Sequence, residues 1–341
     1  MKKKLLKAPG NDGEILLSPN IPRIIEETKE GRTIGTAHQP YFFNPGVSTK
    51  FIFLDALHDT NKKFIFVDTD KVHLEVNIPV AKGAIVSKQF IVTDQVLYQY
   101  PRPKEDTIVS LFSDIEGVLK AYEYAQDIVD HLREFKEIFL GIKGTSLKEI
   151  LVRSFLTFFN INTGYIFISN LLATKEFRSF FERIFTDDAA FRHVFNTALD
   201  EYRHEYRFRY KHFPFPKLEE DELPFWVLRQ GVRQRCFKRD IDTGSVHQQI
   251  ILPRASTLTI FLRLYQLDYF IHGIGGGNYE WVGDRVIENF FKLSPSPYIV
   301  VSGTFLLTGS QEREIPYFFY NPAALKEKFI QYINGKIPHL A

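Results

Sequence analysis

The residues of this chain that could carry chemistry lie in three short segments, each after a predicted β-strand. The first, TAHQPYFFNPG at residues 36–46, places a histidine and a glutamine beside two prolines and a glycine. A histidine can donate a hydrogen bond to an anion or transfer a proton near neutral pH. Gly46 opens a predicted helix, whose first amides and positive dipole end favour an anion. The site residues predicted here are His38, Gln39, Asn44, Gly46 and Lys50, and the alternative is a rigid loop whose histidine bonds to backbone carbonyls.

The second segment is FIHGIGGGNYEWVGDRV, at residues 270–286. Three consecutive glycines between a predicted strand and a predicted helix allow positive φ angles and close backbone approach, as an anion-binding nest requires. The segment contains neither a Walker A motif nor GxGxxG, and a structural turn is the alternative. Arg254, which opens the preceding helix, could bind a phosphate or carboxylate in bidentate fashion. The ligand-binding residues predicted here are Arg254, His272, Gly273, Gly275, Gly276, Gly277 and Tyr279.

The third segment, VDTD at residues 67–70, places two carboxylates at the end of a predicted core strand. Asp68 and Asp70 could hold a hydroxylated ligand, coordinate Mg²⁺ or act as a base. Aspartate at a strand end is also a common turn former. We predict His38, Asp68 and Asp70 as catalytic residues. No residue is assigned as a metal ligand, because His204 and His212 lack the HExxH spacing and fit a solvated helix face better.

The elements that must position these segments alternate between strand and helix. Residues 32–37 predict a strand, 47–58 a helix and 62–68 a second strand with an apolar centre. Together they form a βαβ unit with a right-handed crossover. Residues 74–80 and 87–93 alternate in polarity and predict a hairpin or meander laid beside this sheet. The fold class expected is α/β, a Rossmann-like and nucleotidyltransferase-like mostly parallel sheet with a helical insertion.

The chain divides into four predicted parts. Residues 1–28 form an N-terminal arm, 29–106 the first half of the core, 107–216 a mainly helical insertion, and 217–341 the second half of the core with the glycine loop. A strand at 164–172 returns to the sheet within the insertion. The second half contains predicted strands at 223–229, 232–240, 246–252, 268–273 and 297–303, predicted helices at 255–267 and 278–292, and a hairpin turn at DTGS.

Composition sets limits on the function. The 341 residues are 44% hydrophobic and 25% charged, with a net charge of +2, which is typical of a folded globular protein and argues against nucleic-acid binding. There is no run of 18 apolar residues, and the basic start Met1 to Lys7 lacks the features of a secretory signal. Cys236 is the only cysteine, so an internal disulfide is excluded. We expect a soluble, cytoplasmic protein without a membrane partner, and the oligomeric state is left open.

Three blocks in order carry a resemblance to known proteins. They are TAHQPYFFNPGVSTKFIFLDAL, FIFVDTDKVHLEV, and PFWVLR followed by PRASTLTIFLRLYQLDYFIHGIGGGNYEWVGDRVIENFF. Together they resemble an uncharacterised bacterial family with HQPxxFxPG and FIHGIGGxxY motifs. At greater distance the first two blocks are similar to the bacillithiol-synthesis cysteine-adding enzyme and to O-antigen-cluster HQP proteins. Those groups have Rossmann-like cores related to nucleotidyltransferases.

The resemblance implies that His38 contacts nucleotide phosphates and that Gln39, Pro45 and Gly46 shape the first loop. It also implies a role for Asp68 and Asp70. The chain departs from the cysteine-adding enzyme at two places, since Thr69 stands where that enzyme has a histidine and Ala37-His38 where it has Gly-Gln. These departures argue against cysteine ligation in particular.

The function expected is therefore binding of a nucleotide or other anionic metabolite, with Mg²⁺ as a candidate ion, followed by group transfer or ligation. A transferase or ligase in the biosynthesis of a thiol or sugar-derived metabolite would fit. One alternative is a non-catalytic metabolite-binding or regulatory protein on the same fold. A second is a scaffold protein that acts through the helical insertion at 107–211.

Overall fold

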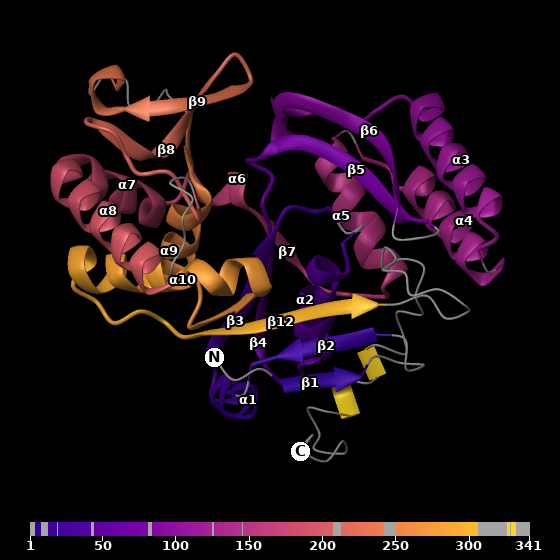
Figure 1. The fold of residues 1–341 in the computed structure, drawn as a ribbon, viewed down its shortest axis with the longest axis horizontal. Coiled ribbons are helices and arrows are strands. Elements are labelled where there is room, and N and C mark those ends of the chain that lie inside the picture. Colours follow the sequence, from indigo (N-terminus) through magenta and orange to yellow (C-terminus); the bar gives the residue numbers. More distant parts are fainter. Residues whose placement is uncertain are drawn as a thin grey trace.

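The computed structural model describes residues 4–7, 13–18, 20–41, 44–80, 84–124, 126–144, 146–206, 213–241, 250–305, 326–327 and 329–331. These residues form a mixed α/β structure with two β-sheets (Figure 1). None of the described helices is both long enough and apolar enough to cross a membrane.

The larger sheet has seven strands in the order β1-β2-β12-β11-β3-β4-β7. Neighbouring strands from β12 to β7 are parallel, whereas β1 and β2 are antiparallel to their neighbours. A mostly parallel sheet was expected and is confirmed. Its strands are β1 (Lys4–Lys7), β2 (Gly13–Leu17), β12 (Tyr298–Phe305), β11 (Tyr269–His272), β3 (Thr33–His38), β4 (Asn61–Phe66) and β7 (Tyr165–Phe167).

Alternation along the strands divides the core into two layers. On β4, Phe64 and Phe66 enter one buried cluster and Ile65 enters the other, because successive side chains of a strand point to opposite faces. The first cluster includes residues of α1 (Ile21–Lys29), α2 (Pro45–Ala56), α3 (Glu105–Ala121), α4 (Gln126–Gly141) and α5 (Leu147–Phe158). The second includes residues of α6 (Ile168–Leu171), α7 (Lys175–Thr186), α8 (Asp188–Glu205), α9 (Ala255–Tyr265) and α10 (Ile274–Val286). Helices therefore cover both faces of the large sheet.

The smaller sheet has five antiparallel strands in the order β10-β8-β9-β6-β5. They are β10 (Ile250–Pro253), β8 (Glu222–Arg229), β9 (Val232–Phe237), β6 (Ile85–Val96) and β5 (Lys71–Pro79). In Figure 1, α7 and α8 lie near β8 and β9, and α3 and α4 lie near β6. The expected hairpin forms as β5 and β6. It belongs to the smaller sheet, where β6 pairs with β9 from the second half of the chain.

Three other expectations differ from the structure. Residues of the predicted N-terminal arm form two strands of the large sheet and helix α1. The strand predicted at 164–172 ends after three residues, and α6 follows it directly. The helix predicted to start at 278 starts at Ile274 and continues as a π-helix, Ile287–Phe291. Short 3-10 turns occupy Leu97–Gln99 and Lys238–Asp240. The predicted DTGS turn lies outside the described residues.

Candidate functional site

A cavity of about 830 Å³ lies where the carboxyl ends of β3 and β11 meet residues of the smaller sheet. The chain leaves β3 into α2 on one face of the large sheet and leaves β11 into α10 on the other. Adjacent strands whose connections diverge in this way leave a crevice at their carboxyl ends. The predicted site residues that line it are His38, Gln39, Asn44, Gly46, Lys50, Asp70, Arg254, His272, Gly273, Gly275, Gly276 and Tyr279.

Asp68 does not line this cavity, and its assignment as a catalytic residue is corrected. Its carboxylate is completely buried and accepts hydrogen bonds from Lys148 Nζ at 2.7 Å and from the Ser169 backbone N–H at 2.9 Å. The Ser169 hydroxyl donates to the same carboxylate. A buried charge needs such partners to offset its lost hydration. Asp68 therefore joins the end of β4 to α5 and α6.

Asp70 does reach the cavity, but both of its carboxylate oxygens are occupied. Gln39 Nε2 donates to Oδ2 at 2.6 Å, and the Lys71 backbone N–H donates to Oδ1 at 2.8 Å. Arg233, from β9, forms an ion pair with Oδ1. Asp70 thus links the first loop, the end of β4 and the smaller sheet. This arrangement positions Gln39 and Arg233 and leaves the carboxylate poorly placed to act as a free base.

His38 lies at the end of β3 with one ring nitrogen fixed. Its Nδ1 is 3.1 Å from the Gln39 carbonyl oxygen, which can only accept, so Nδ1 carries the proton. Burial, together with the charge of Lys50, lowers the pKa of His38 to about 3, and the ring is neutral at physiological pH. The other nitrogen, Nε2, is therefore left with a lone pair that can accept a proton or a hydrogen bond.

The start of α2 was expected to offer free amides to an anion, and this expectation is wrong. Asn44 is the N-cap residue, and its Oδ1 accepts a hydrogen bond from the Gly46 N–H at 2.8 Å. The N–H groups of Val47 and Ser48 donate to the Asn44 carbonyl oxygen. Pro45 has no N–H to offer. All of the first-turn donors of α2 are thus used within the turn, because asparagine is a good N-cap.

The glycine segment is the first turn of a helix and not a loop. Gly275, Gly276 and Gly277 all lie in α10, and the described glycines with positive φ are Gly31 and Gly231. The expected nest with positive φ angles is therefore wrong. Small size is needed for another reason: a Cβ on Gly276 would overlap the ring of His272, and a Cβ on Gly277 would overlap Val300. Gly277 packs against β12 and does not line the cavity.

The start of α10 remains open toward the cavity. Its N-cap residue, Gly273, has no side chain to accept a hydrogen bond. Within the described part of the chain, the N–H groups of Ile274, Gly275 and Gly276 have no acceptor outside the helix. These three residues line the cavity. Unpaired amides at a helix start, reinforced by the helix dipole, form a site that favours an anion.

Lys50 supplies a positive charge beside that helix start. Only 3% of the residue is exposed, it lines the cavity, and its side chain approaches Gly273. Burial lowers the pKa of Lys50 from 10.5 to about 7, and no carboxylate opposes this effect. A buried lysine without an acidic partner is unfavourable for folding, so its presence here is consistent with a ligand-binding role.

His272 stands on the same wall and is backed by a buried charge pair. Its Nε2 lies 3.2 Å from Glu280 Oε1, and Arg263 pairs with the other oxygen of Glu280. Burial alone would raise the pKa of Glu280, but His272 and Arg263 outweigh it and lower this pKa to about 2. Burial lowers the pKa of His272, although Glu280 opposes this. The ionised carboxylate therefore lies close to the imidazole at the start of α10, although Nε2 and Oε1 do not meet hydrogen-bond geometry.

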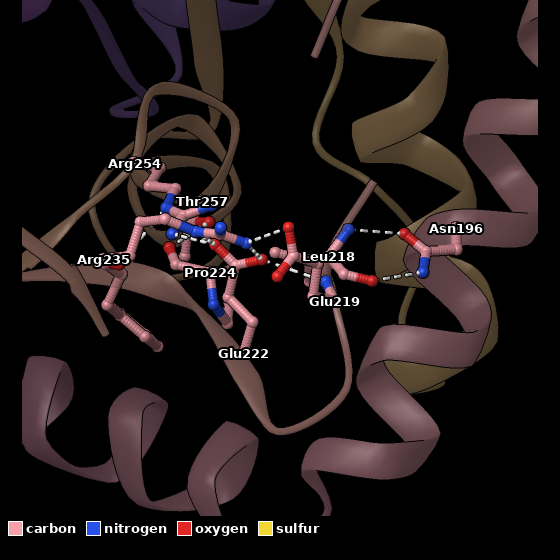
Figure 2. Close-up of polar contacts among 9 residues, drawn as sticks. Asn196, Leu218, Glu219, Glu222, Pro224, Arg235, Arg254 and Thr257 are labelled. Carbon is pink, nitrogen blue, oxygen red and sulfur yellow. Dashed lines mark hydrogen bonds and ion pairs between the residues drawn. The ribbon is translucent and has the colours of Figure 1, made fainter. Parts of the chain in front are cut away.

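Arg254 is held by a charge cluster rather than freely available as a clamp. Glu222 accepts hydrogen bonds from both Arg235 and Arg254 (Figure 2). The distance from Arg254 Nη2 to Glu222 Oε1 is 2.6 Å. Arg254 Nε also donates to the Phe225 carbonyl oxygen. Its guanidinium lies 4.3 Å from the ring centre of Trp226. Nη1 has no partner within the described residues, so its two N–H groups remain for a ligand.

Several wall residues were missed by the sequence reasoning. Trp226 and Arg233 come from the smaller sheet, and Phe195 and Phe215 come from α8 and the segment after it. Tyr279 packs against Phe215, with ring centres 4.8 Å apart. No local motif identifies these residues, because only the tertiary fold brings the predicted strands of the smaller sheet and the α8 region to the ends of β3 and β11. The cavity therefore combines a polar end with an aromatic wall.

The described residues contain no group of three or more His, Cys, Asp or Glu side chains that could hold a metal ion. Comparison of the chain with protein-family models, curated proteins and solved structures gives no match.

Proposed function

We propose that this protein binds a nucleotide or another anionic metabolite in the cavity and catalyses a group transfer or ligation on it. The observation that carries the proposal is the meeting of Lys50 with the uncapped start of α10. Both features are costly without a ligand, since the ammonium is buried and the amides lack acceptors. A phosphate or carboxylate would satisfy both at once.

The strand order supports a Rossmann-like core for this site. Numbered from β3 along the chain, the five parallel strands follow the order 3-2-1-4-5 across the sheet. Rossmann-like folds use this order and bind nucleotides between the first and fourth of these strands. In this chain those strands are β3 and β11, which carry His38 and His272 at their ends. The cavity volume and its aromatic wall fit a ligand of nucleotide size.

The chemistry proposed for the site is proton transfer beside a bound anion. In its neutral form, His38 can accept a proton at Nε2 from an attacking hydroxyl or amine. The negative charge of a bound ligand would raise the pKa of both His38 and Lys50, which makes each a better proton carrier in the complex than in the free protein. Gln39, held by Asp70, would orient the ligand.

A non-catalytic binding protein is the second candidate, and one observation favours it. Asp70 is the only carboxylate on the wall described here, and both of its oxygens are engaged. With Asp68 directed elsewhere, neither predicted acid provides a free base. Such a cavity could hold and sense a metabolite without changing it.

A thermal-shift screen with calorimetric follow-up tests the proposal. The probes are AMP, ADP, ATP, sugar phosphates, amino acids and inorganic phosphate, because a ligand of the folded state raises its melting temperature. We expect phosphate-bearing compounds to stabilise the wild type and to lose at least tenfold in affinity for Lys50→Met. Absence of any such stabilisation would contradict the proposal.

His38→Asn then separates the two candidates. Binding that persists while turnover of the identified ligand stops would support the enzyme. Equal turnover in wild type and variant would remove His38 from the mechanism.

A further inference from the structure

The start of a second helix, α9, also lines this cavity. Helix α9 begins after β10, a strand of the smaller sheet, and its N-cap residue Arg254 makes no side-chain cap. The N–H groups of Ala255, Ser256 and Thr257 have no acceptor outside the helix within the described residues. Ala255 and Ser256 line the cavity.

Ser256 provides an independent sign that this helix start receives a ligand. Only 7% of the residue is exposed, it lines the cavity, and its hydroxyl has no hydrogen-bond partner within the described part of the chain. Because the residue lines the cavity and its hydroxyl makes no bond to the described protein, that hydroxyl is free to bond to a ligand acceptor. Arg254 adds the unused Nη1 donor beside it.

Arg254 is held in one position by hydrogen bonds to Glu222 and to the Phe225 carbonyl oxygen, as a ligand-binding residue should be. Glu222 is 2% exposed and accepts hydrogen bonds from Arg235, Arg254 and the Glu219 backbone N–H (Figure 2). Burial opposes its ionisation, but these donors lower the pKa of Glu222 to about 2. Thr257 Oγ1 donates to the Pro224 carbonyl oxygen and fixes the first turn of α9. Arg254 and the α9 amides are therefore held in place before any ligand arrives.

We propose that the cavity binds two separate anionic groups, the first at α10 with Lys50 and the second at α9 with Ser256 and Arg254. This inference rests on the proposed function and specifies its substrates. The second group is a carboxylate or phosphate, carried by a co-substrate or by the far end of one two-headed ligand. Two anionic groups bound in one cavity would suit a transfer or ligation between the molecules that carry them, and the aromatic lining could contact their apolar parts.

The test uses inorganic phosphate and calorimetry at constant ionic strength. We expect two phosphate sites in the wild type. Ser256→Asp should remove one, with at least a tenfold loss of affinity, because its carboxylate occupies the α9 start and repels the anion. An acid in the first turn of a helix is compatible with folding. Lys50→Met should remove the other site.

Thr107→Asp is the matched control, since it adds the same charge to the exposed first turn of α3 and should leave both sites unchanged. Ser256→Ala, which adds no charge, should weaken the second site by a smaller factor. A single site that Lys50→Met removes and Ser256→Asp leaves intact would overturn the inference and keep the proposed function. Absence of any phosphate binding would overturn both.

Once a nucleotide ligand is known, succinate distinguishes the two sources of the second anion. Additive binding of nucleotide and succinate would indicate a co-substrate, and competition between them a two-headed ligand.

Discussion

The first turns of α2 and α10 occupy similar places in the fold, but only the first turn of α2 is capped by a side chain. Each follows a central parallel strand, each contains glycine, and each reaches the same cavity. In α2 the Asn44 side chain and carbonyl accept from the turn's own N–H groups, whereas Gly273 leaves those of α10 without a side-chain acceptor. A single N-cap residue thus decides whether a helix start is closed or available to an anion.

The two turns also differ in the charged side chains beside them. The open turn of α10 has Lys50 beside it, and Lys50 belongs to α2. The closed helix therefore contributes its side chain to the site, and the open helix contributes its backbone. Four substitutions test this division of roles.

Lys50→Met should have the largest effect on stability. Lowering the lysine pKa from 10.5 to about 7 corresponds to about 4 to 5 kcal/mol, at about 1.4 kcal/mol per pKa unit. The folded protein binds fewer protons than the unfolded chain between these values, so wild-type stability should rise as pH increases from 7 to 10.5. The variant should be more stable at pH 6 and lose this advantage toward pH 10.5. Urea unfolding of both proteins between pH 6 and pH 10.5 measures this difference in stability.

The control for this pH effect is Lys143→Met, an exposed lysine, which should leave the profile unchanged. If wild type and Lys50→Met show parallel pH profiles, the amine of Lys50 is solvated and the proposed anion site loses its main support.

Gly276→Ala should destabilise the protein by about 1 to 3 kcal/mol, because the new methyl group overlaps the His272 ring in a packed region. Gly275→Ala is the matched control on the same turn, where a Cβ meets no atom within 4 Å. That variant should keep or slightly gain stability, since alanine favours the helix. Thermal unfolding compares them, and equal melting temperatures would contradict the close packing of His272 on α10.

Gly273→Asp converts the open turn into a closed one. The position has extended backbone angles and room for a Cβ, and the carboxylate can accept from the first α10 amides and pair with Lys50. We expect about 1 kcal/mol of added stability and at least a tenfold loss of phosphate affinity, measured by calorimetry. Phosphate binding equal to that of the wild type would place the anion elsewhere.

Asn44→Ala performs the reverse change on α2 and should have the smallest effect. Loss of the cap should cost about 1 kcal/mol, and phosphate affinity should stay within twofold of the wild type. A large loss of affinity would show that α2 takes part in anion binding directly, contrary to the comparison above.

Much of the sheet and part of the site follow from sequence pattern. The apolar runs at β3, β4, β11 and β12 predicted the central strands, and the segments with His38 and His272 were predicted at the ends of strands. Parallel strands bring their carboxyl ends to one edge, so residues far apart in sequence converge without further information. The pattern could not reveal the smaller sheet, because the pairing of β6 with β9 joins distant parts of the chain.

What the sequence alone determined is therefore the identity of the central strands and the edge at which His38, Lys50 and His272 gather. Tertiary structure decided how each polar side chain is used. Asp68 turns to Lys148, eighty positions away in the chain, while Asp70 turns to Gln39 and Arg233. Asp68 and Asp70 have different partners because each carboxylate bonds to the donors nearest to it. Those donors come from distant parts of the chain and are in place only when the whole fold forms.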